Sequence, residues 1–232
     1  MHRALQGPNV SCPAKHKSFV LINAKANERK VNVEFSLQGV PIAKRGIDRS
    51  TEMRNLKQAL LPDFENIQRK IFVLSGPGGI GKTKLAIEFM RQCYTRFSEV
   101  LRLDGISKDS LKTSIAGYAS KIPLDQMSDT SRIYASTGEG DINTIVQDVL
   151  TWLTDSANNR WLLTIDNVDR DSNPQFSPSE LDPLAYDIMQ FLPSANHGSI
   201  IITTRLAELE QLGESQAAEK ADNNIACKIL MS

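Results

Sequence analysis

The sequence predicts an α/β fold, in which helices cover both faces of a mostly parallel sheet to form a three-layer sandwich. Short, continuously apolar runs recur along the chain, as expected for strands that are buried on both faces. The segments between them repeat apolar residues every three or four positions, which is typical of amphipathic helices. Alternation of this kind favours right-handed crossovers onto a parallel sheet.

The first predicted elements are a lead-in helix, a buried strand and a second helix. Residues 49–61 carry an apolar helical face and stop at Pro62, which cannot continue a helix. A strand is predicted over residues 71–74 and an amphipathic helix over residues 82–97. A glycine-rich turn joins this strand directly to this helix.

The alternation continues into the middle of the chain. The sequence predicts a strand over residues 100–103, a helix over 109–122, and a helix that Asp141 caps and that extends to Leu153. Residues 125–140 are polar and rich in turn formers, so we expect an exposed loop there.

The last third of the chain contains two more buried strands. They are predicted over residues 161–165 and 199–203, with a Ser-, Asn- and Pro-rich loop (171–183) and a short helix between them. Residues 217–221 suit a short final strand, and Asp222 suits the cap of a last helix.

Charge divides the chain near residue 70. The length of 232 residues suits one α/β domain with a short extension, and 27 basic residues balance 27 acidic ones overall. Residues 1–70, however, carry 13 Lys and Arg against 6 Asp and Glu. A basic start can be an organelle transit peptide or a nucleic-acid-binding arm, but Pro8 and Pro13 interrupt it. We therefore expect residues 1–40 to be a basic, loosely ordered extension.

Composition excludes several classes of protein. The apolar runs are all shorter than the 18 or more residues that a membrane span needs. The 3 cysteines are odd in number and far apart, which excludes a dense disulfide framework and a spaced zinc site. A reducing, cytoplasmic location is therefore predicted.

The glycine-rich turn carries the clearest chemical signal. Residues 76–83 read Gly-Pro-Gly-Gly-Ile-Gly-Lys-Thr and fit the phosphate-binding P-loop pattern. Its glycines let backbone N–H groups approach phosphate oxygens, and the positive N-terminal end of the next helix points at the same oxygens. Lys82 would add a full charge, and we expect its side chain to point into solvent when the site is empty. The Thr83 hydroxyl would ligate Mg²⁺.

A metal-binding carboxylate is predicted at the end of another buried strand. Asp166 follows the apolar run that starts at Trp161, and we expect it to hold Mg²⁺ together with Thr83. Asp166 and Asn167 are the candidate catalytic residues. Because an amide orients water but cannot accept its proton, Asn167 predicts at most a slow ATPase. Asp169 is a possible but misplaced substitute for the missing base.

A third strand end completes the predicted site. Residues 199–203 lead into Thr204 and Arg205, where the carboxyl edge of a parallel sheet would face the γ-phosphate. Arg205 would then detect whether that phosphate is present.

The segments GPGGIGKT, RWLLTIDNVDR and HGSIIITTRLAEL, in this order, resemble the NB-ARC domain of STAND-class signalling ATPases, which belong to the P-loop NTPase fold. This module occurs in plant resistance proteins, apoptosome scaffolds and fungal NOD-like receptors. The sequences of these segments are most similar to those of the fungal branch. The resemblance covers the chain from about Val40 to Met231.

The resemblance implies how the adenine is held. A Gly-Arg element precedes the loop in the family, and here Gly46 to Arg49 occupies that place, with Arg49 as the matching residue and Ile47 as a ring contact. With the loop and Arg205 included, the residues assigned to the nucleotide are Ile47, Arg49, Gly76, Pro77, Gly78, Gly79, Ile80, Gly81, Lys82, Thr83, Lys84 and Arg205.

The resemblance also implies a domain plan. Residues 41–65 form a lead-in helix with the adenine-contact element, and residues 66–232 form the nucleotide-binding domain. Family members continue into a helical subdomain, a winged-helix subdomain and a sensor region, so the chain is expected to be a fragment. The apolar face Ile225, Ile229 and Leu230 would then be poorly covered, which favours self-association through this domain.

Two functions compete at this stage. The leading hypothesis is a binding switch that takes ADP or ATP with Mg²⁺ and signals by oligomerisation. The alternative is an active P-loop ATPase or a small phosphotransferase, although residues 123–141 contain a single arginine, Arg132, where an acceptor-binding lid would cluster several. Nucleic-acid binding is disfavoured because no helix presents several Lys and Arg residues on one face.

Overall fold

A computed structural model of the chain describes residues 49–63, 67–172 and 184–217. All of them belong to one compact unit, Val31–Ser232. The predicted extension (1–40), Ile47 and the predicted C-terminal helix lie outside the described residues.

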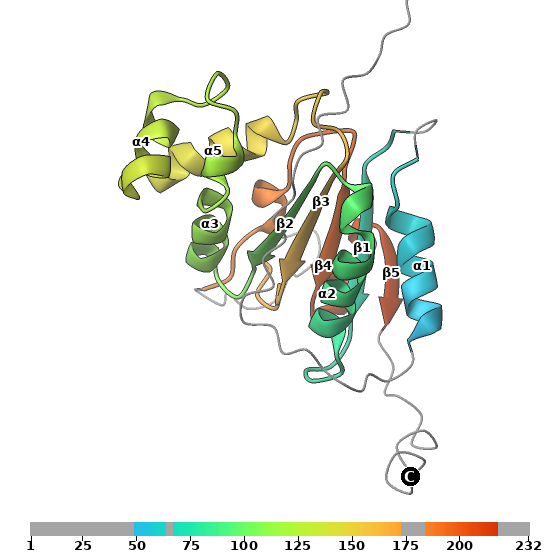
Figure 1. Cartoon of the computed structure of the whole chain (residues 1–232). Coiled ribbons are helices and arrows are strands. Elements are labelled where there is room, and N and C mark those ends of the chain that lie inside the picture. Colours follow the sequence, from blue (N-terminus) through green and yellow to red (C-terminus); the bar gives the residue numbers. More distant parts are fainter. Residues whose placement is uncertain (1–48, 64–66, 173–183, 218–232) are drawn as a thin grey trace, which may run out of the picture. The chain divides into compact units, whose positions relative to one another are not determined.

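The described residues form a five-stranded sheet in which every pair of neighbours is parallel (Figure 1). The strand order is β2-β3-β4-β1-β5. The bounds of the strands are β1 Lys70–Ser75, β2 Glu99–Asp104, β3 Trp161–Asp166, β4 Ser199–Thr203 and β5 Glu214–Ala217. This confirms the predicted α/β fold with a parallel sheet, and it is the sandwich that P-loop proteins use.

Helices pack on both faces of the sheet, as predicted. Their bounds are α1 Ser50–Leu60, α2 Lys82–Cys93, α3 Lys108–Ala116, α4 Asp129–Thr137 and α5 Ile142–Trp152. In Figure 1, α1 and α2 lie on one side of the strands, and α3 and α5 lie on the other. Successive residues of one strand enter opposite cores: Leu162 joins the core under α1 and α2, whereas Leu163 joins the core under α3 and α5.

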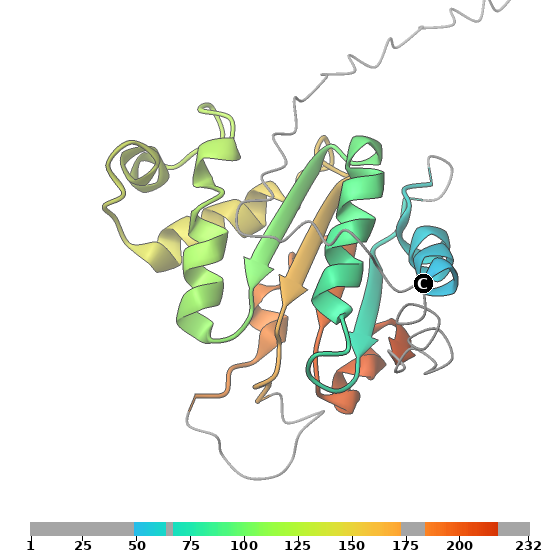
Figure 2. The same cartoon turned by 60° about the horizontal axis from the view of Figure 1, so that its bottom comes forward.

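Strand order determines which chain segments meet. β4 lies between β1 and β3, with Leu74 opposite Thr203 and Ile165 opposite Ile202. The arrowheads of the strands point to one edge of the sheet, where the turn from β1 into α2 also lies (Figure 2). The ends of three strands that are distant in sequence therefore converge at this edge.

Helix α4 contradicts the prediction of an exposed loop over residues 125–140. The Ser128 hydroxyl caps its first turn by accepting a hydrogen bond from the Ser131 N–H at 3.2 Å, and Gly138 ends it in the left-handed conformation. The helix buries a polar residue, Ser131, whose hydroxyl donates to Asp148 at 2.6 Å. A helix without an apolar stripe gives no periodic signal, which is why the sequence suggested a loop.

Other boundaries differ in smaller ways. The helix predicted over residues 109–122 ends at Ala116 and is followed by a short 3₁₀ turn. The final strand starts at Glu214, earlier than predicted, and residues 218–221 lie outside the described residues. The Asp141 cap is confirmed, because its carboxylate accepts hydrogen bonds from the N–H groups of Asn143 and Thr144.

The outer edge of β2 is occupied by side chains. The Arg102 N–H donates to the Tyr118 hydroxyl at 2.8 Å, and this hydroxyl donates to the Arg102 carbonyl. The Asp104 N–H donates to the Ser114 hydroxyl at 3.1 Å. Burial raises the pKa of Tyr118, so its hydroxyl keeps the proton that it donates.

A glycine sets the entry into β4. Gly198 has a φ of 85°, and a methyl group placed on it would lie 2.3 Å from the indole ring of Trp161, which is fully buried. The chain therefore needs glycine here both for its backbone and for its packing.

Among the described residues, no helix combines the length and the apolar character that crossing a bilayer would require.

Candidate functional site

The turn between β1 and α2 has the backbone of an anion-binding loop. Gly76, Gly79 and Gly81 adopt positive φ angles of 130°, 76° and 95°, which side chains other than glycine tolerate poorly. Helix α2 starts directly after Gly81, and no side chain caps its first turn. Its first N–H groups are therefore left for another acceptor, and a phosphate at a helix N-terminus is such an acceptor.

Lys82 does not point into solvent, so the prediction about its side chain was wrong. Lys82 is buried, and its ammonium group donates to the carbonyls of Gly76 at 2.5 Å and Pro77 at 2.9 Å. Burial lowers the pKa of Lys82, and the nearby Arg205 lowers it further, whereas Asp169 and Asp166 counteract both. The loop's own carbonyls thus hold the lysine in place, because they supply the hydrogen bonds that water no longer gives to the buried ammonium group.

Asp166 links the loop to two strands. Its carboxylate side chain is 3% exposed, and Oδ1 accepts hydrogen bonds from Thr83 at 2.7 Å and Thr203 at 2.6 Å. The predicted metal residues Thr83 and Asp166 are therefore in direct contact, although they are 83 positions apart in the sequence. Asp166 itself does not line the cavity described below.

Sequence reasoning missed Arg102, which also binds Asp166. Its guanidinium Nη2 lies 3.0 Å from Asp166 Oδ2, on the side of the carboxylate that the two hydroxyls leave open. Arg102 belongs to β2, the neighbour of β3, and pairs in register with Thr164. The only signal for it was a charged residue inside the apolar run 100–103, and that signal becomes meaningful only once the strand pairing is known.

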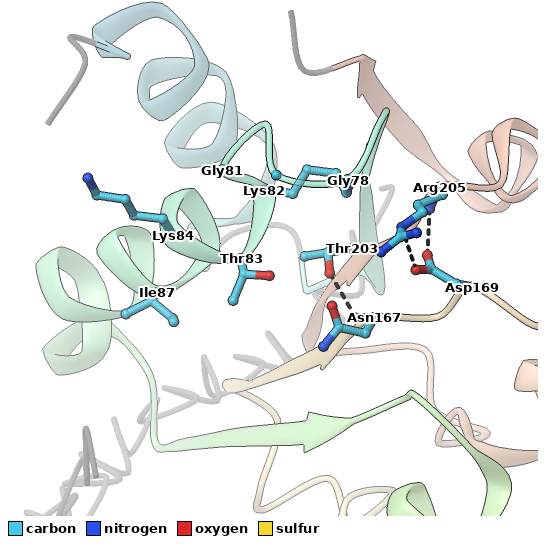
Figure 3. Close-up of a pocket in the computed structure, with 11 residues that line it drawn as sticks. Gly78, Gly81, Lys82, Thr83, Lys84, Ile87, Asn167, Asp169, Thr203 and Arg205 are labelled. Atoms are coloured by element: carbon cyan, nitrogen blue, oxygen red, sulfur yellow. Dashed lines mark hydrogen bonds and ion pairs between the residues drawn. The ribbon is translucent and has the colours of Figure 1, made fainter. Parts of the chain in front are cut away.

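Asn167 occupies a conformation that suits its amide. Its φ of 63° is left-handed, a region in which asparagine is one of the better tolerated residues. Its N–H donates to the Thr203 hydroxyl at 3.0 Å (Figure 3). Asn167 lines the cavity but carries no carboxylate that could act as a base.

Arg205 is held by Asp169 at the same edge. Arg205 Nε lies 3.0 Å from Asp169 Oδ2, and the Arg205 N–H donates to Oδ1 at 2.7 Å (Figure 3). A methyl group placed on Gly78 would lie 3.2 Å from the guanidinium carbon of Arg205, so Arg205 packs against the loop. Asp169, described above as misplaced for a base, lines the cavity but is engaged as a partner of Arg205.

Arg49 contacts the loop but does not line the cavity described below. Its Nη2 donates to the Ile80 carbonyl, and a methyl group placed on Gly81 would lie 3.4 Å from the same nitrogen. Its Nη1 is buried, makes no hydrogen bond within the described residues, and lies 3.9 Å from Glu52 Oε1. The structure therefore brings Arg49 to the loop, whereas its predicted companion Ile47 lies outside the described residues.

These groups surround a cavity of about 400 Å³. Eleven residues line it, namely Gly78, Gly79, Gly81, Lys82, Thr83, Lys84, Ile87, Asn167, Asp169, Thr203 and Arg205. The predicted residues Gly76, Pro77, Ile80 and Arg49 shape the loop without lining the cavity. Lys84 lines it but extends away from Arg205 in Figure 3. Ile87 and Thr203 were not predicted, although Ile87 lies one helical turn after Thr83.

The donors present fit a hard divalent cation. A threonine hydroxyl next to one carboxylate is the kind of partial site that Mg²⁺ uses when phosphate oxygens and water complete its shell. Within the described ranges, no cluster of three or more His, Cys, Asp or Glu side chains could hold a metal on its own. The site therefore suits a metal that arrives with a phosphate ligand.

No protein-family model matches the chain, and no curated protein matches it either. The resemblance to NB-ARC domains therefore stays a prediction.

Proposed function

We propose that this chain is an adenine-nucleotide-binding switch module of a cytoplasmic STAND or NOD-like signalling protein, taking ADP or ATP with Mg²⁺. The observation that carries the proposal is the convergence of an uncapped helix N-terminus, a loop with three left-handed glycines and a buried lysine at one sheet edge. Phosphate binding is supported by this geometry. The adenine preference, the signalling role and self-association through the domain are supported by the resemblance alone.

The proposal places the phosphates between α2 and Arg205. Backbone N–H groups of the loop and of the first turn of α2 would bind the β-phosphate. Lys82 would exchange the carbonyls of Gly76 and Pro77 for phosphate oxygens, a stronger class of hydrogen bond because both partners are charged. Thr83 and Asp166 would hold Mg²⁺, which would neutralise negative charge on the phosphates.

The second candidate is a P-loop ATPase or phosphotransferase. It shares the phosphate site but needs a group that activates water or an acceptor hydroxyl. Asn167 is an amide, and the Asp169 carboxylate is already paired with Arg205. These two observations favour a binder over an enzyme.

Mass spectrometry of the nucleotide released from purified, denatured protein separates the two candidates. A switch retains ADP through purification. An enzyme has an empty site and turns ATP over in solution, and that result would replace the leading proposal with the alternative. A protein that neither retains nor binds nucleotide would contradict both.

Asp166→Asn is expected to separate the metal from the nucleotide. The amide keeps the shape of the carboxylate but not its charge, so Mg²⁺ affinity should fall by about 10- to 100-fold while ADP still binds. The measurement is nucleotide affinity across a Mg²⁺ titration. Asp148→Asn is the matched control, because Asp148 also accepts hydrogen bonds from two hydroxyls, those of Ser128 and Ser131. If Mg²⁺ enhances binding to Asp166→Asn as strongly as to the wild type, Asp166 is only a structural residue.

Two variants are expected to change the affinity for ATP relative to ADP in opposite directions, and together they test the role of Arg205. Arg205→Gln removes the charge that faces the γ-phosphate, so the affinity for ATP relative to ADP should fall by about tenfold. Asp169→Asn frees the guanidinium from its partner, so the same ratio should rise. Competition binding with both nucleotides measures the ratio. Equal ratios in the wild type and both variants would exclude Arg205 as a sensor of the γ-phosphate.

A further inference from the structure

We propose that Arg102 is a built-in counter-cation of Asp166 and competes with Mg²⁺ for that carboxylate. The inference rests on the proposed function, since it concerns the cation requirement of the same site. It predicts that the site binds nucleotide even without metal. It also predicts that the site is half-saturated at a higher Mg²⁺ concentration than a site with Thr83 and Asp166 but without Arg102.

The geometry leaves one oxygen of Asp166 for a cation, and Arg102 occupies it. Oδ1 accepts both threonine hydroxyls, at 2.7 and 2.6 Å, whereas Oδ2 accepts from the Arg102 guanidinium at 3.0 Å. A hydroxyl leaves the negative charge of a carboxylate in place, but a guanidinium neutralises it. Arg102 therefore supplies the positive charge that Mg²⁺ would otherwise bring to this carboxylate.

The consequence for a nucleotide follows from the sign of the charges. A carboxylate that is 3% exposed and close to the phosphates repels them unless a cation lies between. With Arg102 in place, that repulsion is reduced before any metal binds. With Mg²⁺ in place, Arg102 and the metal repel each other, so each binds Asp166 less well in the presence of the other.

Arg102 can leave the carboxylate without disturbing the sheet. Its side chain is 41% exposed, so solvent can receive the guanidinium. Its backbone is held independently, because its N–H and carbonyl both bond to the Tyr118 hydroxyl. Movement of this residue is therefore a matter of side-chain rotation.

A purely structural role explains the arginine less well. β2 and β3 are already paired over their whole length, from Glu99 opposite Trp161 to Asp104 opposite Asp166. A further link between these strands is not needed to set their register, and what the guanidinium adds is a positive charge beside a buried carboxylate. The contact that distinguishes Arg102 is the one with the predicted metal residue.

The test compares Arg102→Gln with the wild type in two conditions. In EDTA, the affinity for ADP should fall by about fivefold, the effect of a partly exposed charge pair. In a Mg²⁺ titration at fixed ADP, the half-saturating Mg²⁺ concentration should fall by about fivefold, because the metal no longer competes with a guanidinium. A structural residue would not produce this pair of opposite effects, since a loosened site weakens both ligands.

Two further variants serve as controls. Arg102→Lys keeps a charge and should lie between the wild type and Arg102→Gln in both measurements. Arg132→Gln breaks an ion pair of similar length, 3.1 Å to Asp129, away from the site, and should change neither. Unchanged or jointly weakened binding of ADP and Mg²⁺ in Arg102→Gln would overturn the inference.

A titration with Mn²⁺ in the presence of inorganic phosphate, followed by electron paramagnetic resonance, distinguishes failure of this inference from failure of the proposed function. If the wild type binds no nucleotide, the proposed function fails. Tighter Mn²⁺ binding to Arg102→Gln than to the wild type would still support competition at Asp166. Equal Mn²⁺ binding, or none in either protein, would overturn it.

Discussion

Lys82→Ala is expected to abolish nucleotide binding. Lys82 is the charged group that the loop holds beside the uncapped start of α2, and no other lysine donates to the loop carbonyls of Gly76 and Pro77 within the described residues. Ligand at a thousand times its Kd should stabilise the wild type by roughly 4 kcal/mol, and this stabilisation should vanish in the variant. Thermal unfolding with and without ADP measures it.

The matched control for this experiment is Lys70→Ala. Lys70 also donates to a backbone carbonyl, that of Leu61 at 2.6 Å, but it lies at the opposite end of β1. This variant should keep the full ADP-dependent shift. Because Lys82 also braces the empty loop, Lys82→Ala should have a more protease-sensitive loop without ligand, which Lys70→Ala should not show. An equal ADP shift in Lys82→Ala and the wild type would defeat the assignment of the phosphate site.

Gly198→Ala is expected to cause a large loss of stability. The added methyl group would lie 2.3 Å from the ring of Trp161, which is fully buried, so either the ring or the backbone at Gly198 has to shift within the core. Overpacking together with a left-handed backbone should lower the free energy of unfolding by about 3 kcal/mol. For a domain of this size, Tm should fall by roughly 6 to 12 °C.

Gly138→Ala separates the two causes of that loss. Gly138 shares the left-handed backbone, with a φ of 76°, but a methyl group there would meet nothing within 4 Å. Its cost should be about 1 kcal/mol, the backbone contribution alone. Denaturant unfolding of both variants gives the packing contribution by difference. A similar loss in the two variants would show that the contact with Trp161 is not limiting.

The fold was predictable from the sequence because its strands are buried. β3 and β4 are buried at every position, so their sequences are mostly apolar without a helical period and stand out from the helices. β5 has the sequence Glu-Ser-Gln-Ala and is mostly exposed, so no apolar run marks it in the sequence. Its position in the sheet is defined by its pairing with β1. Helix α4 escaped prediction for a related reason, because Ser131 is buried by hydrogen bonding to Asp148 rather than by apolar packing.

The candidate site was predictable where it lies in one continuous segment. The loop from Gly76 to Thr83 can be identified from the sequence because its glycines, lysine and threonine have the fixed spacing of the P-loop pattern. The partners of Asp166 and Arg205 depend instead on strand order, which short-range patterns do not encode. Arg102 contacts Asp166 because β2 is the neighbour of β3. Lys82 points into the protein because its ammonium group donates hydrogen bonds to two carbonyls of the loop.

The side chains that occupy the outer edge of β2 have a consequence for assembly. An open edge strand is a template on which a second chain can add its own strand, by exchange or by amyloid-like growth. At β2 an incoming strand would have to displace both the Tyr118 hydroxyl and the Ser114 hydroxyl to reach the N–H groups of Arg102 and Asp104. Copies of this domain that associate are therefore expected to meet through side-chain surfaces on this flank, and not to build a continuous intermolecular sheet across it.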